Sequence, residues 1–270
     1  MSWRDVAHKD IHDASRSLTL WGLFGFLSLL FIGYAVAYAY SGDETFVGFV
    51  AGIVAIVDPV LPVLGILLGY RAISDERNDG SLLLSMSLPQ SRTELLVGKA
   101  LGRTIVLLVP TLLGLSIAGL YAALRYGTKG VIAYPWFLFA TVLYGASFVA
   151  VAVALSASTT NDRRITLGAV GAYVLMAVLW RRLISFGVAF LHRFDLSLGT
   201  PDWALFLQLA EPGESYARLL RAGFDIDRAS RYAVDGVPMF VDWWAALVLL
   251  LIWIAVPLAA GYRRFGSSDL

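Results

Sequence analysis

The sequence predicts an all-α membrane protein with six transmembrane helices, an N-terminal interfacial amphipathic helix and short outer helices before the last span. Of the 270 residues, 58% are hydrophobic even without the 25 glycines, and only 15% are charged. Soluble domains are about 45–50% apolar with glycine included and about 25% charged. The apolar residues also gather into long runs with polar stretches between them. We therefore interpret residues 1–270 as a single transmembrane domain.

Six runs are long enough to span a bilayer. A helix that crosses about 30 Å of hydrocarbon needs roughly 20 mostly apolar residues. The fifth run is interrupted by Arg181-Arg182, so its helix either ends there or continues through Ser185–Leu191 as a bent or re-entrant segment; we favour an end or a break near Arg181. The six runs are Leu18–Tyr40, Phe46–Tyr70, Thr104–Leu124, Pro135–Ser156, Ile165 to about Phe190, and Trp243–Gly261.

The segment 1–17 has a helical period. Its charged residues lie off one apolar stripe, which favours a helix lying in the membrane interface over a frayed cytoplasmic tail. The stripe consists of Trp3, Ala7, Ile11, Ala14 and Leu18.

Basic residues set the orientation of the spans, because short cytoplasmic loops carry an excess of Lys and Arg. With the N-terminus inside, the cytoplasmic pieces carry twelve basic residues, whereas the two short outer loops carry only Arg125 and Lys129. We expect a multi-pass protein of the plasma membrane with both termini cytoplasmic. The twelve are Arg4, Lys9, Arg16, Arg71, Arg77, Arg92, Lys99, Arg103, Arg163, Arg164, Arg263 and Arg264.

The charged stretch between the second and third spans, within 71–103, carries the most specific pattern. It resembles the first large cytoplasmic loop of type-2 ABC transporter permeases, which reads roughly E-R-x-x-G-T-L-x-x-L-L-x-x-P-x-S-R-x-x-x-x-x-G-K. Six spans are also typical of that family. The residues that fit the frame are Glu76, Arg77, Gly80, Ser81 in place of Thr, Leu82, Pro89, Ser91, Arg92, Gly98 and Lys99.

The resemblance implies that this stretch docks on a separate ATPase subunit and couples ATP hydrolysis to the spans. Docking calls for a short helix with an apolar side and charged ends, between Gly80 and Pro89. Ser91 and Glu94 then fit a capping box that starts the next helix. The alternative is an ordinary amphipathic loop on the membrane surface. The coupling residues are Asp75, Glu76, Arg77, Gly80, Leu82, Leu83, Met86, Pro89, Ser91 and Arg92.

Asp58 is a candidate intramembrane polar site. It lies near the middle of the second span, in a sequence where Pro59 and Pro62 each remove a helical donor and leave carbonyls for neighbouring groups. A carboxyl group at that depth needs a partner, a proton or water. Two interpretations stay open: a polar point on a translocation path at a dimer seam, and a structural carboxyl paired with a nearby Ser, Thr, Tyr or Trp.

The extracytoplasmic segment 191–241 has two short helical patterns. Thr200-Pro201 predicts the start of the first helix, with Thr as the cap, and Glu211-Pro212-Gly213 interrupts it before a second helix over Glu214–Ala222. The phrase around Glu211, Pro212, Glu214, Tyr216, Arg218 and Leu219 is similar to the N-P-x-D-x-Y/F-R-L phrase of the permeases that serve nitrous-oxide-reductase and copper-enzyme maturation.

Several chemistries are excluded by the residues themselves. The chain has no cysteine, which removes thiolate metal sites and cysteine nucleophiles. Gly98-Lys99 is followed by Ala100 and has Thr93 in place of the first P-loop glycine, so we expect no ATP binding by that route. The net charge of +1 gives no basic patch for nucleic acid. His8 and His12 lack a third ligand, so we expect neither a metal nor a cofactor.

We interpret the chain as the permease subunit of an ABC transporter and not as an enzyme. The implied partners are a separate ABC ATPase, a second permease in a homodimer or heterodimer, membrane lipid and an extracytoplasmic accessory protein; the transported substrate stays open. The alternatives are a non-transporting membrane scaffold and an intramembrane enzyme. An intramembrane enzyme would need a catalytic set, such as two aspartates on facing spans, that Asp58 alone does not provide.

Overall fold

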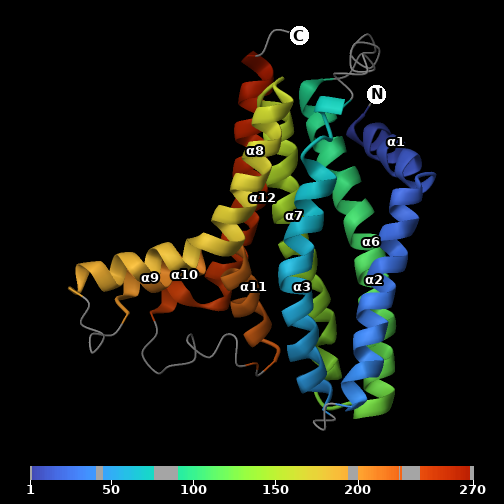
Figure 1. Cartoon of the computed structure of the whole chain (residues 1–270), viewed down its shortest axis with the longest axis vertical. Coiled ribbons are helices and arrows are strands. Elements are labelled where there is room, and N and C mark those ends of the chain that lie inside the picture. The colour runs from blue at the N-terminus through green and yellow to red at the C-terminus, as the bar shows by residue number, and fades with distance from the viewer. Residues whose placement is uncertain are drawn as a thin grey trace.

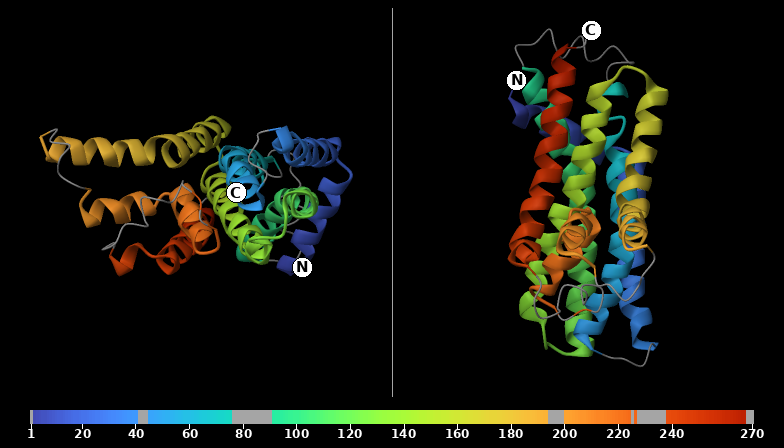
Figure 2. Two further views of the ribbon diagram at one scale, coloured as in Figure 1. Left: turned by 90° about the horizontal axis from the view of Figure 1, so that it is seen from below. Right: turned by 90° about the vertical axis from the view of Figure 1, so that its left-hand side faces the viewer.

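A computed structural model describes residues 2–40, 45–75, 91–193, 200–224, 226 and 238–267. The regular structure in these ranges is helical, and six of the helices are long and apolar enough to cross a membrane (Figure 1). The predicted fold class, an all-α polytopic membrane protein with six spans, is confirmed. Figure 2 shows that the start of the chain and the end of its last helix lie at the same end of the molecule.

The first three helices follow the predicted ranges closely. Helix α1 spans Trp3–Ser15, and α2 spans Leu18–Ala37 and continues into the 3₁₀ turn η1, Tyr38–Tyr40. Helix α3 spans Phe46–Gly69. Ser17 and Thr45 start α2 and α3 by accepting backbone N–H groups through their side-chain oxygens, which satisfies donors that a helix start leaves free.

The third span is much longer than its apolar run. Helix α6 covers 35 residues, Arg92–Tyr126, and so begins twelve residues before the predicted span Thr104–Leu124. The helix that the Ser91–Glu94 capping box predicts therefore runs without interruption into the third span. After Gly127, the 3₁₀ turn η2, Val131–Ala133, leads into α7, Tyr134–Ser158. Gly127 and Gly130 have φ of 93° and 89°, values that glycine adopts without strain.

The fifth span bends. Helix α8, Asp162–Tyr173, runs into the π-helix η3, Val174–Leu179, and the chain then continues as α9, Trp180–Leu191. In Figure 1, α9 projects sideways from the bundle as an arm. The favoured end or break near Arg181 is wrong, because helix continues through Arg181 and Ser185 to Leu191. The alternative of a bent segment is the one observed, and the bend follows the π-helix Val174–Leu179. π-Helical turns commonly mark such irregularities.

Two short helices follow this arm and lead to the last span, and the first of them lies beside α9 (Figure 2). Helix α10 spans Asp202–Leu209, and α11 spans Pro212–Arg221. The predicted start of α10 shifts by one residue, with Pro201 as its N-cap, and α11 begins at Pro212 because the Glu211 side chain caps it. The 3₁₀ turn η5, Met239–Val241, precedes α12, Trp243–Ser267.

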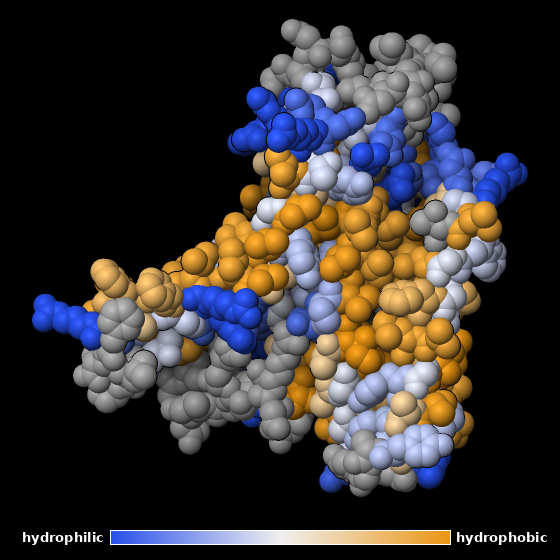
Figure 3. Space-filling view, in the orientation of Figure 1, coloured by the Kyte–Doolittle hydropathy of each residue, from blue (hydrophilic) through white to orange (hydrophobic). Residues whose placement is uncertain are grey.

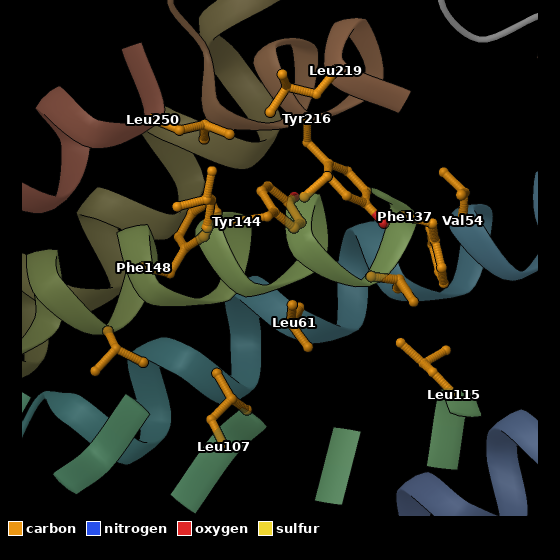
Figure 4. Close-up of a cluster of buried hydrophobic side chains, with 14 of the residues drawn as sticks. Val54, Leu61, Leu107, Leu115, Phe137, Tyr144, Phe148, Tyr216, Leu219 and Leu250 are labelled. Carbon is orange, nitrogen blue, oxygen red and sulfur yellow. The ribbon is translucent and has the colours of Figure 1, made fainter. Parts of the chain in front are cut away.

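Helix α7 lies at the centre of the bundle and packs against α3, α6, α11 and α12. In its most apolar 18-residue window 72% of the residues are buried, against 6% in the bent fifth span. Phe137, Tyr144 and Phe148 are fully buried on α7 and meet side chains from α3, α6 and α11 (Figure 4). The fifth span, by contrast, exposes most of its apolar surface, as a lipid-facing or subunit-facing helix would.

Glycines let two helices approach α7 closely. A Cβ atom on Gly69 of α3 would lie 2.7 Å from the Cβ of Ala152, and one on Gly261 of α12 would lie 2.9 Å from the Cα of Ala154. Small residues at such contacts allow close van der Waals packing, which is a main source of helix association in membranes.

We predict that Gly69→Ala lowers the free energy of unfolding by about 1–3 kcal/mol, because the new methyl group overpacks the contact between α3 and α7. Gly25→Ala on α2 is the matched control, since a Cβ there meets nothing within 4 Å. Thermal unfolding in detergent, followed by tryptophan fluorescence, measures both variants. Equal midpoints for the two variants would contradict the close-packing account.

Candidate functional site

The ends of the predicted coupling stretch are fixed to the bundle. Seven of its residues, Glu76, Arg77, Gly80, Leu82, Leu83, Met86 and Pro89, lie outside the described residues. Before them, the N–H groups of Ile73 and Ser74 donate to Ser156 Oγ on α7 at 3.0 and 3.1 Å, and Asp75 is exposed. The stretch therefore leaves the bundle from a point held by the central helix.

After the gap, Ser91 starts α6 with the predicted capping box. Ser91 Oγ accepts the Glu94 N–H at 3.2 Å, and Glu94 Oε2 accepts the Ser91 N–H at 2.8 Å. The next residue, Arg92, lies over the ring of Phe265 at 5.5 Å and donates to the Phe265 carbonyl oxygen. Since Phe265 is buried near the end of α12, the exit of the stretch is held by the last span.

A buried ion-pair cluster fixes α1 to the first turns of α6. Lys99 Nζ donates to Asp10 Oδ1 at 2.8 Å, and Arg103 Nε lies 3.1 Å from Asp10 Oδ2. The Lys99 and Asp10 side chains are only 6% and 3% exposed. A Cβ on Gly98 or Gly102 would collide with Val6 or Asp10, so these two glycines make room for α1. We call this arrangement the α1–α6 clamp.

Sequence reasoning missed the clamp. The predicted stripe on the N-terminal helix contains Ala7 but neither Val6 nor Asp10, which are the other residues that α1 buries. One signal was present: Gly98 and Gly102 form the small-xxx-small spacing that marks close helix contacts. Whether α1 also lies in the membrane interface stays a prediction.

Asp58 is hydrogen-bonded to Tyr144 of α7. The Tyr144 hydroxyl lies 2.9 Å from the Asp58 carbonyl oxygen and 3.1 Å from its Oδ1. Pro62 has no N–H, so the Asp58 carbonyl lacks the helical donor that residue 62 would otherwise supply. Tyr144 takes the place of that donor. This contact matches the structural interpretation of Asp58, although the carboxyl also faces a cavity.

The start of α11 brings two more carboxyl groups to Asp58. Gly213 packs between Asp58 and Glu211, since a Cβ there would lie 3.2 Å from Asp58 Oδ1 and 2.7 Å from Glu211 Oε1. Glu214 is buried and pairs with Arg181 of α9 at 3.2 Å. Burial, with the neighbouring charges of Glu214 and Asp58, raises the pKa of Glu211 to about 8. The sequence analysis noted Glu211 and Glu214 as part of one sequence phrase, but it did not predict that they lie close to Asp58.

Tyr216 fixes α11 to the bundle next to this cluster. Its ring stacks on Tyr144 with centroids 4.6 Å apart, and its hydroxyl lies 3.1 Å from Thr141 Oγ1. Figure 4 shows the two tyrosines side by side at the centre of the core.

A cavity of about 340 Å³ opens beside the three carboxyl groups, at the angle where the chain turns from α8 into α9. Volumes of this size hold small ligands. We call it the elbow cavity. It is lined by Asp58, Pro59, Tyr144, Tyr173, Met176, Ala177, Val178, Trp180, Arg181, Arg182, Glu211 and Glu214.

His8 and His12 stack with ring centroids 6.5 Å apart on the exposed side of α1. Among the described residues, no group of three or more His, Cys, Asp or Glu side chains is arranged to hold a metal ion.

Comparison with known proteins is consistent with this arrangement. Residues 4–270 match a family model described as ABC-2 family transporter protein. Two curated relatives are each described as "Probable ABC transporter permease protein NosY". The one from Pseudomonas aeruginosa is 29% identical over 96% of both chains. The one from Stutzerimonas stutzeri is 27% identical over 97% of this chain and 96% of its own.

Removing Asp10 should destabilise the protein by about 3–5 kcal/mol, because Asp10→Ala leaves buried cationic groups without their counter-ion. The double variant Asp10→Leu/Lys99→Met should lose clearly less stability than Asp10→Ala, since it removes both members of the Asp10–Lys99 ion pair. Asp13→Ala, an exposed carboxyl on the same helix, is the control. Unfolding midpoints in detergent compare the three. A double variant as unstable as Asp10→Ala would rule out a buried charge pair.

Glu211 should make stability depend on pH. Its pKa is about 8 in the folded protein and ordinarily 4.5, so the folded state holds a proton that the unfolded chain releases between these values. The free energy of unfolding should therefore fall as the pH rises from about 4.5 to about 8. Glu211→Gln should flatten this slope, whereas Asp202→Asn, an exposed control, should not. Identical slopes for wild type and Glu211→Gln in thermal unfolding would contradict the shift.

Proposed function

The chain belongs to the ABC-2 transporter family and is the membrane-spanning permease subunit of an ABC transporter, and we propose that a separate ATPase drives it through the stretch from Asp75 to Lys99. The observation that carries this proposal is the anchoring of both ends of the stretch. One end is bonded to Ser156 of α7, and the other begins α6 and contacts Phe265 of α12. A displacement of the stretch would thus act directly on three spans.

The α1–α6 clamp supports the same role. It fixes α1 on the turns of α6 that directly follow the stretch, so the two helices should move as one unit. The N-terminal helix would then widen the surface that responds to the ATPase. Gly98 and Lys99 belong to the sequence pattern that this stretch shares with type-2 ABC permeases. In this structure both residues contribute to the clamp.

We propose that both termini and the coupling stretch are cytoplasmic. The excess of Lys and Arg in the corresponding loops supports this orientation. The six candidate spans among the described residues, an even number, also support termini on one side. The segment that contains α10 and α11 then faces the outside, where an accessory protein could be bound.

The relatives suggest a biological setting. Both are named NosY, which agrees with the resemblance of the Glu211–Leu219 phrase to permeases of nitrous-oxide-reductase and copper-enzyme maturation. We propose that this permease works in such a system as a dimer, moving a substrate or transmitting a mechanical signal to an outer partner. A lone copy leaves the fifth span almost entirely uncovered, which supports assembly with a second permease.

The coupling role predicts a separation of folding from function. If the stretch is a docking surface, Glu76→Ala/Leu83→Ala should insert and unfold like the wild type, because surface substitutions usually shift stability by no more than about 0.5 kcal/mol. The variant should nevertheless lose capture of the ATPase, or keep capture and lose stimulation of ATP turnover, since a few contacts dominate most interfaces. Pull-down and ATP turnover in nanodiscs measure the two effects.

The matched control is Asp202→Ala/Leu207→Ala, which removes one carboxyl and one exposed leucine from α10, outside the stretch. The control should leave capture and turnover unchanged. Normal capture and normal stimulation in Glu76→Ala/Leu83→Ala would mean that the stretch is a plain membrane-surface loop.

A further inference from the structure

The elbow cavity contains charged groups of both signs within a hydrophobic surface. Its carboxyl groups come from α3 and the start of α11, and its guanidinium groups, Arg181 and Arg182, come from the start of α9. Figure 3 shows hydrophilic surface in the angle between the arm and the bundle, whereas the upper face of the arm is hydrophobic and continuous with the bundle. A charged cavity in this setting is costly unless a ligand or water satisfies it.

The arginine side of the cavity has hydrogen-bond donors available for a ligand. Arg181 uses one nitrogen, Nη1, for its ion pair with Glu214, and its side chain is 50% exposed. The Arg182 side chain is exposed, and its guanidinium group makes no hydrogen bond or ion pair within the described part of the chain. Guanidinium groups recognise phosphate oxygens by paired, charge-assisted hydrogen bonds. This part of the cavity therefore suits a phosphate group.

The negative side is lined by aromatic rings. Asp58 and Glu211 lie against Gly213, and Tyr173 and Trp180 line the same cavity. The Trp180 ring is held in place, since its Nε1 donates to the Leu207 carbonyl oxygen at 2.8 Å. Carboxylates combined with aromatic faces are the groups that bind an organic ammonium. Glu214 pairs with Arg181, Asp58 accepts a hydrogen bond from Tyr144, and Arg182 adds a guanidinium group to the same lining.

Apolar surface continues from the cavity along the bend. Leu175, Val178 and Leu179 of η3 are 44%, 37% and 38% exposed, and Leu183 and Phe186 of α9 are exposed further along the arm. Hydrocarbon chains could cover these side chains, whereas water could not do so without cost. A ligand that satisfies the whole region thus has an ammonium, a phosphate and acyl chains.

We propose that the elbow cavity binds the headgroup of a zwitterionic phospholipid, with its phosphate at Arg181 and Arg182 and its ammonium between Asp58 and the aromatic rings of Tyr173 and Trp180. A lipid bound here would link α9 to α3 and α11 and so fix the angle of the arm. Such a lipid would occupy the cavity whether or not an ATPase is coupled to the chain, so loss of lipid selectivity and loss of coupling are separate results.

Native mass spectrometry of the full chain, delipidated in detergent and titrated with three lipids of equal acyl chains, tests the proposal. Phosphatidylethanolamine carries both charges, phosphatidylglycerol carries the phosphate alone, and a trimethylammonium-propane lipid carries the cation alone. Phosphatidylethanolamine should bind about tenfold more tightly than either of the others, since a hydrogen bond to a charged group is worth on the order of a factor of ten or more.

Two variants should change the selectivity in opposite directions. Asp58→Asn should no longer bind phosphatidylethanolamine more tightly than phosphatidylglycerol. Arg182→Gln should no longer bind phosphatidylethanolamine more tightly than the cationic lipid. Asp202→Asn and Arg163→Gln remove the same charges at exposed positions outside the cavity and should keep the wild-type order. Selectivity is a ratio within one variant, so a general loss of stability cannot imitate these shifts.

Equal binding of the three lipids by the wild type would overturn the proposal, and so would an unchanged lipid order in both cavity variants. Binding of the cationic lipid as tight as that of phosphatidylethanolamine would also overturn it, because the cavity would then be an ammonium site without a phosphate subsite.

Discussion

The hydrogen bonds of the Tyr144 hydroxyl are the interaction on which the arrangement of the central helices depends. A membrane interior offers no water to a backbone carbonyl that a proline has left without a donor. Pro62 creates such a carbonyl at Asp58, and Tyr144 reaches it from α7 while also bonding the Asp58 carboxyl. The same ring stacks on Tyr216, which places α11. One side chain of the central helix therefore holds both the proline-containing part of α3 and the helix α11.

The two polar regions of the molecule are joined by long helices. At one end, the α1–α6 clamp and the anchored ends of the coupling stretch lie on α6, α7 and α12. Helix α6 has 35 residues, a length of about 52 Å at 1.5 Å per residue. Near its far end the Tyr126 hydroxyl donates to the Ala35 carbonyl oxygen of α2. Because α3, α6 and α7 pack closely, a rigid displacement at Ser91 would reach the elbow cavity through packed helices and not through a flexible linker.

The sequence predicted local features well and long-range pairs poorly. Hydrophobic runs located all six spans, and neighbouring residues predicted the Ser91–Glu94 capping box. Arg181-Arg182 marked the region of the bend, but the favoured end or break there is wrong because the helix continues to Leu191. The third span was predicted to begin only at Thr104 because Arg92–Arg103 is too polar to count as a span, whereas the capping box had already predicted the helix start at Ser91. Asp10 and Lys99 are 89 residues apart, and Asp58 lies far from Glu211 in the chain, so only tertiary packing could bring these charges together. The coupling residues from Glu76 to Pro89 stay a prediction.

The most direct test is the ATP hydrolysis of the purified chain in nanodiscs, alone and together with a candidate ABC ATPase subunit. A permease without a phosphate-binding loop should hydrolyse no ATP alone, should elute with the ATPase as one complex, and should change the rate of ATP turnover by that subunit. Robust hydrolysis by the chain alone, in a preparation free of any ATPase, would contradict the account.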